Sequence, residues 1–464
     1  MQFTFRRFIR RMAFRSLFIV TAIPFGFSSV GFCQVGLNAN PLDPFPSNVT
    51  VLTEIGKKEP AIATAIESFK TGNIEKLKKD LDEARKANAN LPKPDVMIAR
   101  MLMANGQWPD ALAALESHVA TNPGDAECYK NFAEIAMVGG RWTDAWLHLE
   151  KSYSLVDGMK FPDARKNNFL TELVKLRGEV AERRRDIPMA TKLFETLSKL
   201  QPDKGDAFWA LGRMKVSAGE VDAGSALLKK AKLLDKSLPQ PDLAIASALV
   251  SSGSRDKAEP WFKSGLADKA TSTSANWIEY TQFLIDEGRE ADAKVFLDKA
   301  SAEYQGLREF KLMKAIVARY MSDQETAEQI LSELHRANPN DFDAADNLAL
   351  VLVESNDEGK RARAQQISES NLRQAPDQER LAATAAWVKY KTGSADVADK
   401  ILGQVISGGR ISPQTAYYSA MILKSLGRTE ESNQFMKSSV AAPGTFPQKK
   451  AAKAAMPAEV KATP

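Results

Sequence analysis

The sequence predicts an all-α solenoid of about eleven helix-turn-helix repeats, and three observations support this fold class. A period of mostly 34 residues organises the chain from about residue 58 to residue 440. Two positions of the repeat are almost always occupied by small residues, and a third position between them is usually glycine. Small side chains let the two helices of a pair approach closely, and glycine ends the first helix in a left-handed conformation.

The period is visible when two stretches of the chain are aligned. If the repeat that begins at residue 205 is placed on the one that begins at residue 126, Gly212 falls opposite Ala133 and Gly224 opposite Ala145. Extending this frame in both directions gives the remaining repeats. The expected repeat starts are residues 58, 92, 126, 171, 205, 239, 274, 308, 342, 379 and 413.

The small residues occupy positions 8 and 20 of the repeat. Position 8 is Ala65, Ala99, Ala133, Gly178, Gly212, Ala246, Thr281, Ala315, Ala349, Ala386 and Ala420. Position 20 is Leu77, Ala111, Ala145, Ala190, Gly224, Ala258, Ala293, Ala327, Ala364, Ala398 and Ser432. Glycine inside a helix costs about 1 kcal/mol relative to alanine. We expect close helix packing to offset this cost, since burying one Leu or Phe side chain contributes about 1.5 to 3 kcal/mol.

Position 15 marks the turn within each repeat. Glycine stands there in eight repeats, and the three exceptions are Arg185, Ser322 and Asn356. A second departure concerns a position that is usually apolar, where Ser68, Lys215 and Lys389 stand instead. Residues 157–170 lengthen one connection, and we expect part of them to extend the helix that begins the fourth repeat.

This pattern of small and bulky residues resembles that of tetratricopeptide repeats, and the resemblance spans residues 58–440. It implies a right-handed superhelix whose first helices line a concave groove. A single repeat cannot bury its own apolar face, so stability must come from stacking on neighbouring repeats. The resemblance also implies a protein that binds other proteins or peptides and needs no cofactor.

The two ends of the chain lie outside the repeat array. Residues 1–33 have the layout of a secretory signal peptide: five arginines and then an apolar run that ends in small residues. If this segment is not cleaved, it is a membrane anchor; in both cases we expect an exported protein, periplasmic or extracellular. Residues 34–57 are expected to form a linker. Residues 441–464 are rich in Ala, Pro and Lys, and we expect disorder there, with a short helix over residues 449–455 as the alternative.

The distribution of charge argues against a nucleic-acid partner. The formal charge of +5 comes from the arginines of the first 33 residues, because the remaining chain has 58 basic and 58 acidic residues. Binding to a polyanion by bulk charge is therefore disfavoured.

The sequence offers no strong catalytic or metal-binding motif. Phosphate-binding, zinc-protease and nucleophile-elbow patterns are absent, and the three histidines lie in different repeats. His118 falls at a core position of its repeat, so a packed imidazole is favoured over a metal ligand. Cys128 has no neighbouring histidine in the sequence and is expected to act as a small apolar side chain. We therefore expect a protein that is not an enzyme.

Partner-binding residues are expected on the free face of the first helices, at positions 2, 5, 9 and 12. The third and fourth repeats place acidic residues there, and later repeats place aromatic, apolar and basic ones. The candidate groove residues are Glu127, Glu134, Glu172, Glu179, Trp209, Arg213, Trp387, Tyr390, Tyr417, Met421 and Lys424. For the acidic stretch, a solvated face is favoured over a binding surface. The aromatic residues could also pack on adjacent helices or under the C-terminal tail.

The function that follows is binding of an extended segment or a helix of a partner protein in the groove. One alternative is an envelope scaffold that holds a secretion or polysaccharide-export assembly through its outer surfaces. A more remote alternative is a hydrolase that uses paired carboxylates such as Glu172 and Glu179 as acid and base.

Overall fold

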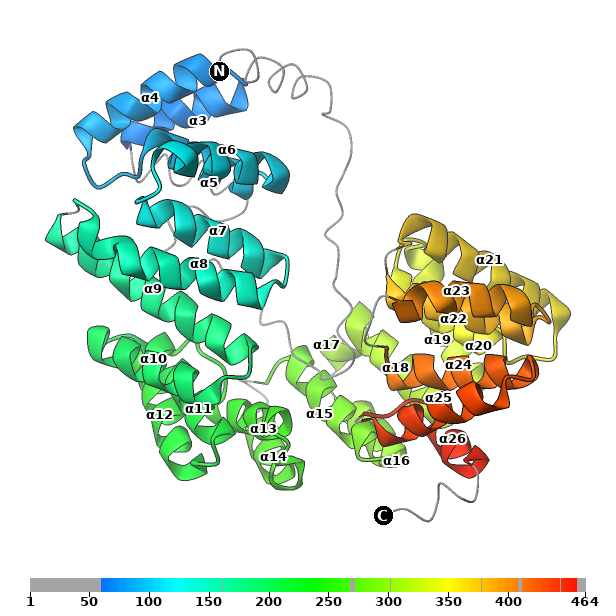
Figure 1. Cartoon of the computed structure of the whole chain (residues 1–464). Helices are drawn as coiled ribbons and strands as arrows, with labels where there is room; N and C mark the ends of the chain where they lie inside the picture. Colours follow the sequence, from blue (N-terminus) through cyan, green and yellow to red (C-terminus); the bar gives the residue numbers. More distant parts are fainter. Residues whose placement is uncertain are drawn as a thin grey trace. The chain divides into compact units, whose positions relative to one another are not determined.

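The computed structural model describes residues 60–160, 162–267, 272–300, 302–376, 378–407, 411–442 and 444–456. Over these residues the chain contains helices and turns and no strand, so the predicted all-α repeat class is confirmed. The helices belong to two compact units, residues 60–276 (the N-terminal unit) and residues 277–456 (the C-terminal unit). Figure 1 shows that each unit is a stack of helix pairs. The predicted signal peptide and the predicted linker lie outside the described residues.

The N-terminal unit contains six helix pairs. Its helices are α3 (Pro60–Lys70), α4 (Ile74–Ala87), α5 (Pro94–Ala104), α6 (Trp108–Thr121), α7 (Ala126–Val138), α8 (Trp142–Leu155), the 3-10 turn η1 (Val156–Gly158), α9 (Asp163–Arg183), α10 (Ile187–Leu200), α11 (Gly205–Ser217), α12 (Val221–Leu234), α13 (Pro241–Ser251), η2 (Arg255–Lys257) and α14 (Glu259–Ala267).

The C-terminal unit contains five pairs and two extra helices, α17 and α26. Its helices are α15 (Ser274–Asp286), α16 (Glu290–Asp298), α17 (Ala302–Gln305), α18 (Arg308–Tyr320), α19 (Gln324–Ala337), α20 (Phe342–Leu352), α21 (Glu358–Gln374), α22 (Glu379–Lys391), α23 (Ala395–Ser407), α24 (Pro413–Ser425), α25 (Thr429–Ala441) and α26 (Lys449–Ala455).

Helix starts follow the local sequence. First helices begin at the expected residues 126, 205, 274, 308, 342, 379 and 413. Helices α5 and α13 begin two residues late, at Pro94 and Pro241, because proline is favoured in the first turn, where its missing N–H is not needed. Helix α9 begins early, at Asp163, so the longer connection does extend it.

Aspartate side chains fix several of the helix starts. Asp186, Asp323 and Asp357 each stand just before a helix and accept a hydrogen bond from a backbone N–H of its first turn. Such a cap satisfies a donor that has no partner within the helix and contributes about 1 kcal/mol. These caps set the points at which the second helices of three repeats begin.

Close packing explains the glycines within the helices. A Cβ atom built on Gly212 would lie 2.7 Å from Cγ of Leu228, and one built on Gly178 would lie 2.7 Å from the ring of Phe194. The alanines at the same repeat positions are fully buried, among them Ala133 and Ala145. Packing between paired helices therefore excludes larger side chains, as the sequence pattern predicted.

The turn position is also confirmed. All eight glycines at position 15 have positive φ angles, from +67° at Gly140 to +90° at Gly219 and Gly393. Arg185 and Ser322 take the same left-handed conformation with φ of 62°, although they carry a Cβ. The shape of the turn is therefore maintained at these two positions although the residue type is unfavourable. Asn356, the third exception, does not have a positive φ.

The polar exceptions in the pattern have polar partners. Ser68 donates a hydrogen bond to Asp80 at 2.5 Å. Lys389 Nζ lies 2.5 Å from Glu369 Oε1, and Lys215 Nζ lies 3.4 Å from Glu195 Oε1. Both glutamates stand at position 25 of the preceding repeat, so each lysine reaches back to the repeat before it.

The expected disorder of residues 441–464 is wrong for much of this segment. Helix α25 continues to Ala441, and α26 covers Lys449–Ala455, as in the alternative interpretation. Phe446 and Ala452 join the apolar core of the C-terminal unit. A composition rich in Ala and Lys favours a helix once one face finds a surface to pack on. In the described part of the chain, no helix combines the length and the apolar character needed to cross a bilayer.

Candidate functional site

The predicted groove residues fall into two groups, one in each unit. The acidic residues, Trp209 and Arg213 lie on α7, α9 and α11 of the N-terminal unit. The other aromatic residues, Met421 and Lys424 lie on α22 and α24 of the C-terminal unit.

In the N-terminal unit the acidic residues alternate with cations that link successive repeats. Lys130 Nζ on α7 lies 2.8 Å from Glu172 Oε2 on α9 and 3.2 Å from Glu134 Oε1 on its own helix. The Lys130 side chain is buried, and the two carboxylates remain partly accessible. The negative charge of the predicted acidic stretch is therefore offset by a lysine of the same surface.

The same pairing continues along α9 and α11. Lys175 Nζ lies 3.9 Å from Glu179 Oε1, and Arg213 donates a hydrogen bond to Glu182. The Glu179 side chain is 39% exposed, yet the surrounding protein raises its pKa because the carboxylate loses water. Trp209 is half-buried beside this row.

Arg165 is a member of this row that the sequence did not reveal. It lies on the first turn of α9, and its Nη2 lies 2.6 Å from Glu127 Oε1 on α7. Burial raises the pKa of Glu127, and the charge of Arg165 opposes this shift. Arg165 Nη1 also donates to the backbone oxygen of Ala89 at 3.4 Å. The sequence feature that could have indicated Arg165 was the extra length of the connection before α9.

We call this row of side chains the charge ladder. Its members are Glu127, Lys130, Glu134, Arg165, Glu172, Lys175, Glu179, Glu182 and Arg213.

In the C-terminal unit the predicted aromatic anchors belong to the core. Trp387 is 4% exposed, stacks on Tyr418 with ring centroids 4.3 Å apart, and donates its indole N–H to Glu354 Oε1 at 3.1 Å. Tyr390 packs beside it with centroids 5.3 Å apart. Trp387 is therefore held by its neighbours on three sides.

Tyr417 is also buried, because the C-terminal tail covers it. Its ring centroid lies 5.6 Å from that of Phe446. Met421 is half-buried and Lys424 is exposed. Trp387 packs on an adjacent helix and Tyr417 packs under the tail. This agrees with the alternative interpretation of the sequence for these two residues.

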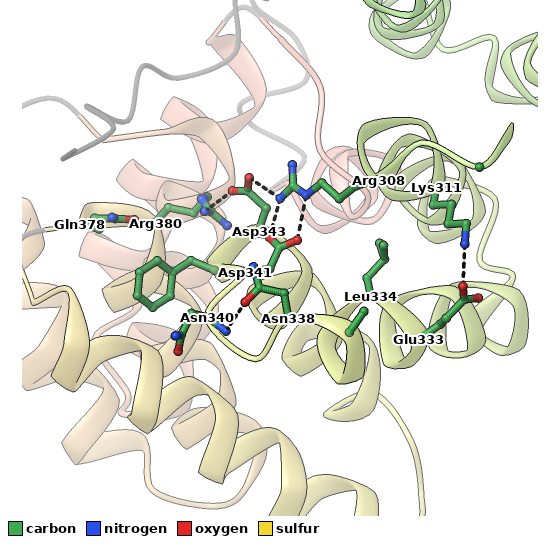
Figure 2. A pocket seen from close by; sticks show the side chains of 13 residues that line it. Arg308, Lys311, Glu333, Leu334, Asn338, Asn340, Asp341, Asp343, Gln378 and Arg380 are labelled. Carbon is green, nitrogen blue, oxygen red and sulfur yellow. Dashed lines mark hydrogen bonds and ion pairs between the residues drawn. The ribbon is translucent and has the colours of Figure 1, made fainter. Parts of the chain in front are cut away.

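A depression of about 560 Å³ lies at the start of α18, α20 and α22 (Figure 2). Arg308 binds Asp341 and Asp343, and Arg380 Nη2 lies 2.8 Å from Asp343 Oδ1. Asp343 thus joins two arginines from the repeats on either side of its own. Burial raises the pKa of Asp341, but the hydrogen bonds and charge of Arg308 outweigh this effect, so the net pKa is lowered.

The network ends at a buried carboxylate. Asp346 on α20 is almost fully buried, and Arg380 Nη1 lies 2.6 Å from its Oδ2. Burial raises the pKa of Asp346, and the charge of Arg380 opposes the shift. Within the described residues its Oδ1 has no hydrogen-bond partner. Both arginines of the depression already bind carboxylates, and their ion pairs connect three successive repeats.

The remaining titratable residues of interest are structural. Neither the depression nor any other group of His, Cys, Asp and Glu in the described ranges could hold a metal ion. His118 is buried between two carboxylates, with Nε2 3.0 Å from Asp125 and Nδ1 3.4 Å from Asp95. Cys128 is buried and lies 3.4 Å from the backbone oxygen of Leu115, and burial raises the pKa of its thiol to about 12.

Comparisons with known proteins agree with the repeat pattern. A family model described as tetratricopeptide repeat matches residues 96–158. Cellulose synthase operon protein C of Pseudomonas fluorescens is 27% identical over 169 residues, which are 36% of this chain and 13% of that protein. The chain therefore matches only a small part of that relative.

Solved structures with similar folds include a tetratricopeptide repeat protein from Parabacteroides merdae, with 14% identity and a TM-score of 0.43, covering 54% of this chain and 96% of that one. Yeast Tom70 has 12% identity and a TM-score of 0.40, covering 86% of this chain and 95% of that one. The family match covers residues 96–158, and the helix pairs and left-handed glycine turns continue the same kind of tetratricopeptide-like repeat through the other described residues.

Proposed function

We propose that the protein is a non-catalytic interaction scaffold whose N-terminal unit binds a segment of a partner protein along the charge ladder. Tetratricopeptide-repeat proteins generally act by binding proteins or peptides rather than by catalysis, which supports this role. The matched residues 96–158 lie in the same unit as the ladder.

The observation that carries the proposal is the pairing of inner-face charges between repeats. Each side chain of the ladder is held in place by a partner, as Lys130 is by Glu134 and Glu172. A binding surface that is already ordered saves the entropy of fixing each long side chain, about 0.5 to 1.5 kcal/mol per residue. The ladder is therefore prepared to bind without reorganisation.

The chemistry of the ladder indicates what kind of segment it binds. A carboxylate can accept several hydrogen bonds, and Glu172 and Glu179 each have one cation partner and keep about a third of their side-chain surface. Their free oxygen positions suit lysine or arginine side chains or the backbone N–H groups of an extended segment. Half-buried Trp209 adds an apolar contact beside Arg213.

The proposal is tested by recovering partners from native extracts with the full chain after chemical cross-linking. We expect the double variant Glu172→Gln, Glu179→Gln to lose most of the partner signal. The matched control is Glu83→Gln, Glu116→Gln, which changes two exposed glutamates of second helices. Circular dichroism checks that both variants are folded. Equal recovery with wild type and both variants contradicts binding along the ladder.

The second candidate is an assembly scaffold of the cell envelope that uses its outer surface. The name of the Pseudomonas relative assigns that protein to a cellulose synthase operon. Leu147 and Leu233 on second helices are 62% and 82% exposed, so both side chains are available for contact with a partner. Partner loss in Leu147→Ser, Leu233→Ser and not in the ladder variant would favour this role.

Both candidates place the protein outside the cytoplasm, because residues 1–33 have the layout of an export signal. Amino-terminal sequencing of the protein from the producing cell tests this. An amino terminus near residue 32 or 34 supports a cleaved signal, and an intact Met1 supports an anchor.

A further inference from the structure

Residues 444–456, which we call the tail segment, pack on Tyr417 of α24 and on helix α25 of the C-terminal unit. Phe446 is 3% exposed and packs on the ring of Tyr417, and Ala452 is fully buried. Helix α26 packs against α25, and Figure 1 shows the two helices side by side. The tail segment therefore covers residues that the sequence pattern assigns to the groove.

The tail segment also contacts helices far from it in the sequence. The Tyr320 hydroxyl of α18 donates a hydrogen bond to the backbone oxygen of Thr445 at 3.2 Å. Lys450 Nζ lies 3.7 Å from Glu290 Oε1 of α16. A helix that only shields the last repeat would touch α24 and α25. The contacts with α16 and α18 show that this segment crosses from the last repeat of the unit to the first two.

Charge complementarity accompanies this crossing. Residues 444–456 contain three lysines and no acidic residue, and the surface they meet carries Asp286 and Glu290. Burial lowers the pKa of Lys449, and the negative charge of Asp286 partly offsets this shift. The acidic end of the site thus matches the basic end of its occupant.

The tail segment is held by the packing of Phe446 and Ala452 and by two polar contacts with distant helices, a hydroxyl-to-carbonyl hydrogen bond and an ion pair whose lysine is 86% exposed. An exposed ion pair contributes little to stability. The segment is tethered to its site, which gives an effective concentration on the order of millimolar and favours the bound state. A segment held in this way can be displaced by a competitor of similar chemistry.

We propose that the surface of the C-terminal unit around Tyr417, Asp286 and Glu290 is a peptide-binding site that the tail segment occupies in cis, so that a partner enters by displacing it. The partner segment has the chemistry of the present occupant: an aromatic anchor that inserts beside Tyr417, followed by a short helix with an alanine face and lysines that meet Asp286 and Glu290. The site is independent of the charge ladder, which lies in the other unit.

The test uses the full chain and a fluorescent peptide with the sequence of residues 444–456, GTFPQKKAAKAAM. We expect the variant Phe446→Ala to bind this peptide at least tenfold more tightly than wild type, because its own tail no longer competes. A peptide with alanine in place of the phenylalanine should bind neither protein. Equal affinity of the peptide for wild type and the variant overturns the proposal.

A second variant covers the case in which Phe446→Ala disturbs the last repeat. Lys450→Glu changes an exposed side chain, so the fold is retained while the pair with Glu290 is lost. This variant replaces the ion pair by a repulsion between two carboxylates, so it should also bind the peptide more tightly than wild type, by a smaller factor than Phe446→Ala. Adding Glu290→Lys should restore the tail contact, and a peptide with glutamate in place of Lys450 should then bind the double variant as weakly as the original peptide binds wild type. An unchanged affinity in Lys450→Glu, or no restoration in the double variant, overturns the displacement mechanism.

Discussion

A Cβ atom on Gly224 would stand 2.6 Å from the backbone oxygen of Gly212, on the facing helix of the same repeat. The contact is mutual, because a Cβ on Gly212 would lie 3.0 Å from the backbone oxygen of Gly224. Helices α11 and α12 thus approach backbone to backbone, and both glycines are needed for it. Glycine within a helix is unfavourable, but only residues without a side chain allow the two backbones to approach this closely.

We predict that Gly224→Ala destabilises the protein although alanine is the better helix former. The new methyl group would meet the backbone nitrogen of Val216 at 2.9 Å, so the helices must separate. Overpacking of this kind costs about 1 to 3 kcal/mol, which outweighs a propensity gain of about 1 kcal/mol. Hydrogen exchange of the α11 and α12 amides measures the loss.

The matched control is Gly403→Ala on α23. Gly403 lies inside a helix, is exposed, and has no atom within 4 Å of its would-be Cβ. Only the propensity gain applies there, so we expect stabilisation of α23 by about 0.5 to 1 kcal/mol. If both substitutions stabilise their helices, close packing does not explain Gly224.

The fold was predictable because tight steric requirements recur in almost every repeat, Leu77 and Thr281 being the larger exceptions. Ala133, Ala145 and their counterparts are buried where a larger side chain would meet the facing helix. The need for close packing therefore appears in the sequence as small residues at a fixed spacing. The same holds for the turn, where glycine reports a left-handed conformation. Arg185 shows the limit of this argument, since it takes the left-handed conformation although it is not a glycine, and the sequence alone therefore does not indicate the turn there.

We predict that Arg185→Gly stabilises the turn between α9 and α10. Arg185 has φ of 62°, a conformation that costs about 1 kcal/mol for a residue with a Cβ. Glycine removes this strain but raises the entropy of the unfolded chain, so we expect a net gain of about 0.5 kcal/mol. Thermal unfolding measures the gain. Gly140→Ala, at the same turn position of the preceding repeat, should have the opposite sign.

The candidate site was less predictable than the fold because its residues depend on contacts between distant segments. Helical periodicity assigned Trp387 and Tyr417 to the inner face, but it could not show that Phe446 covers Tyr417, since that contact depends on how the tail returns. Likewise the acidic residues at inner positions were recognised, but Arg165 was not, because it lies in a longer connection without a repeat position.

We predict that Cys128 is unreactive in the native protein. Its side chain is fully buried, and burial together with the charge of Asp125 raises the pKa of the thiol to about 12. The thiolate is the reactive form, so alkylation at pH 8 requires local unfolding. Mass spectrometry of the peptide that contains Cys128, after iodoacetamide treatment with and without urea, checks this. Rapid labelling without urea would show that the α7 environment is more open than the structure indicates.

The environment of His118 predicts how stability depends on pH. The hydrogen bonds to Asp125 and Asp95 outweigh burial and raise its pKa from 6.5 to about 9. A raised pKa in the folded state means that the charged imidazole stabilises the fold. This contribution is fully present below about pH 6.5 and is lost as the pH rises through about 9. For Asp95, whose pKa is lowered to about 2, the contribution is lost as the pH falls through 2.

Two lysines share the charge of this cluster: Lys93 Nζ lies 3.3 Å from Asp125 Oδ2, and Lys78 Nζ lies 2.8 Å from Asp95 Oδ1. We expect His118→Gln to lower the free energy of unfolding by about 1 to 3 kcal/mol at pH 6, and by much less at pH 10. Urea unfolding followed by circular dichroism at both pH values measures the difference.

Proton NMR of the histidine rings provides the direct control. Burial lowers the pKa of His148 and His335, whereas that of His118 is raised. We therefore expect one ring to titrate near pH 9 and two rings to titrate below 6.5, with the high-pH titration absent from His118→Gln. If all three rings titrate below 7, the imidazole is neutral in the fold, and the carboxylates of Asp95 and Asp125 then depend on Lys78 and Lys93 alone for neutralisation.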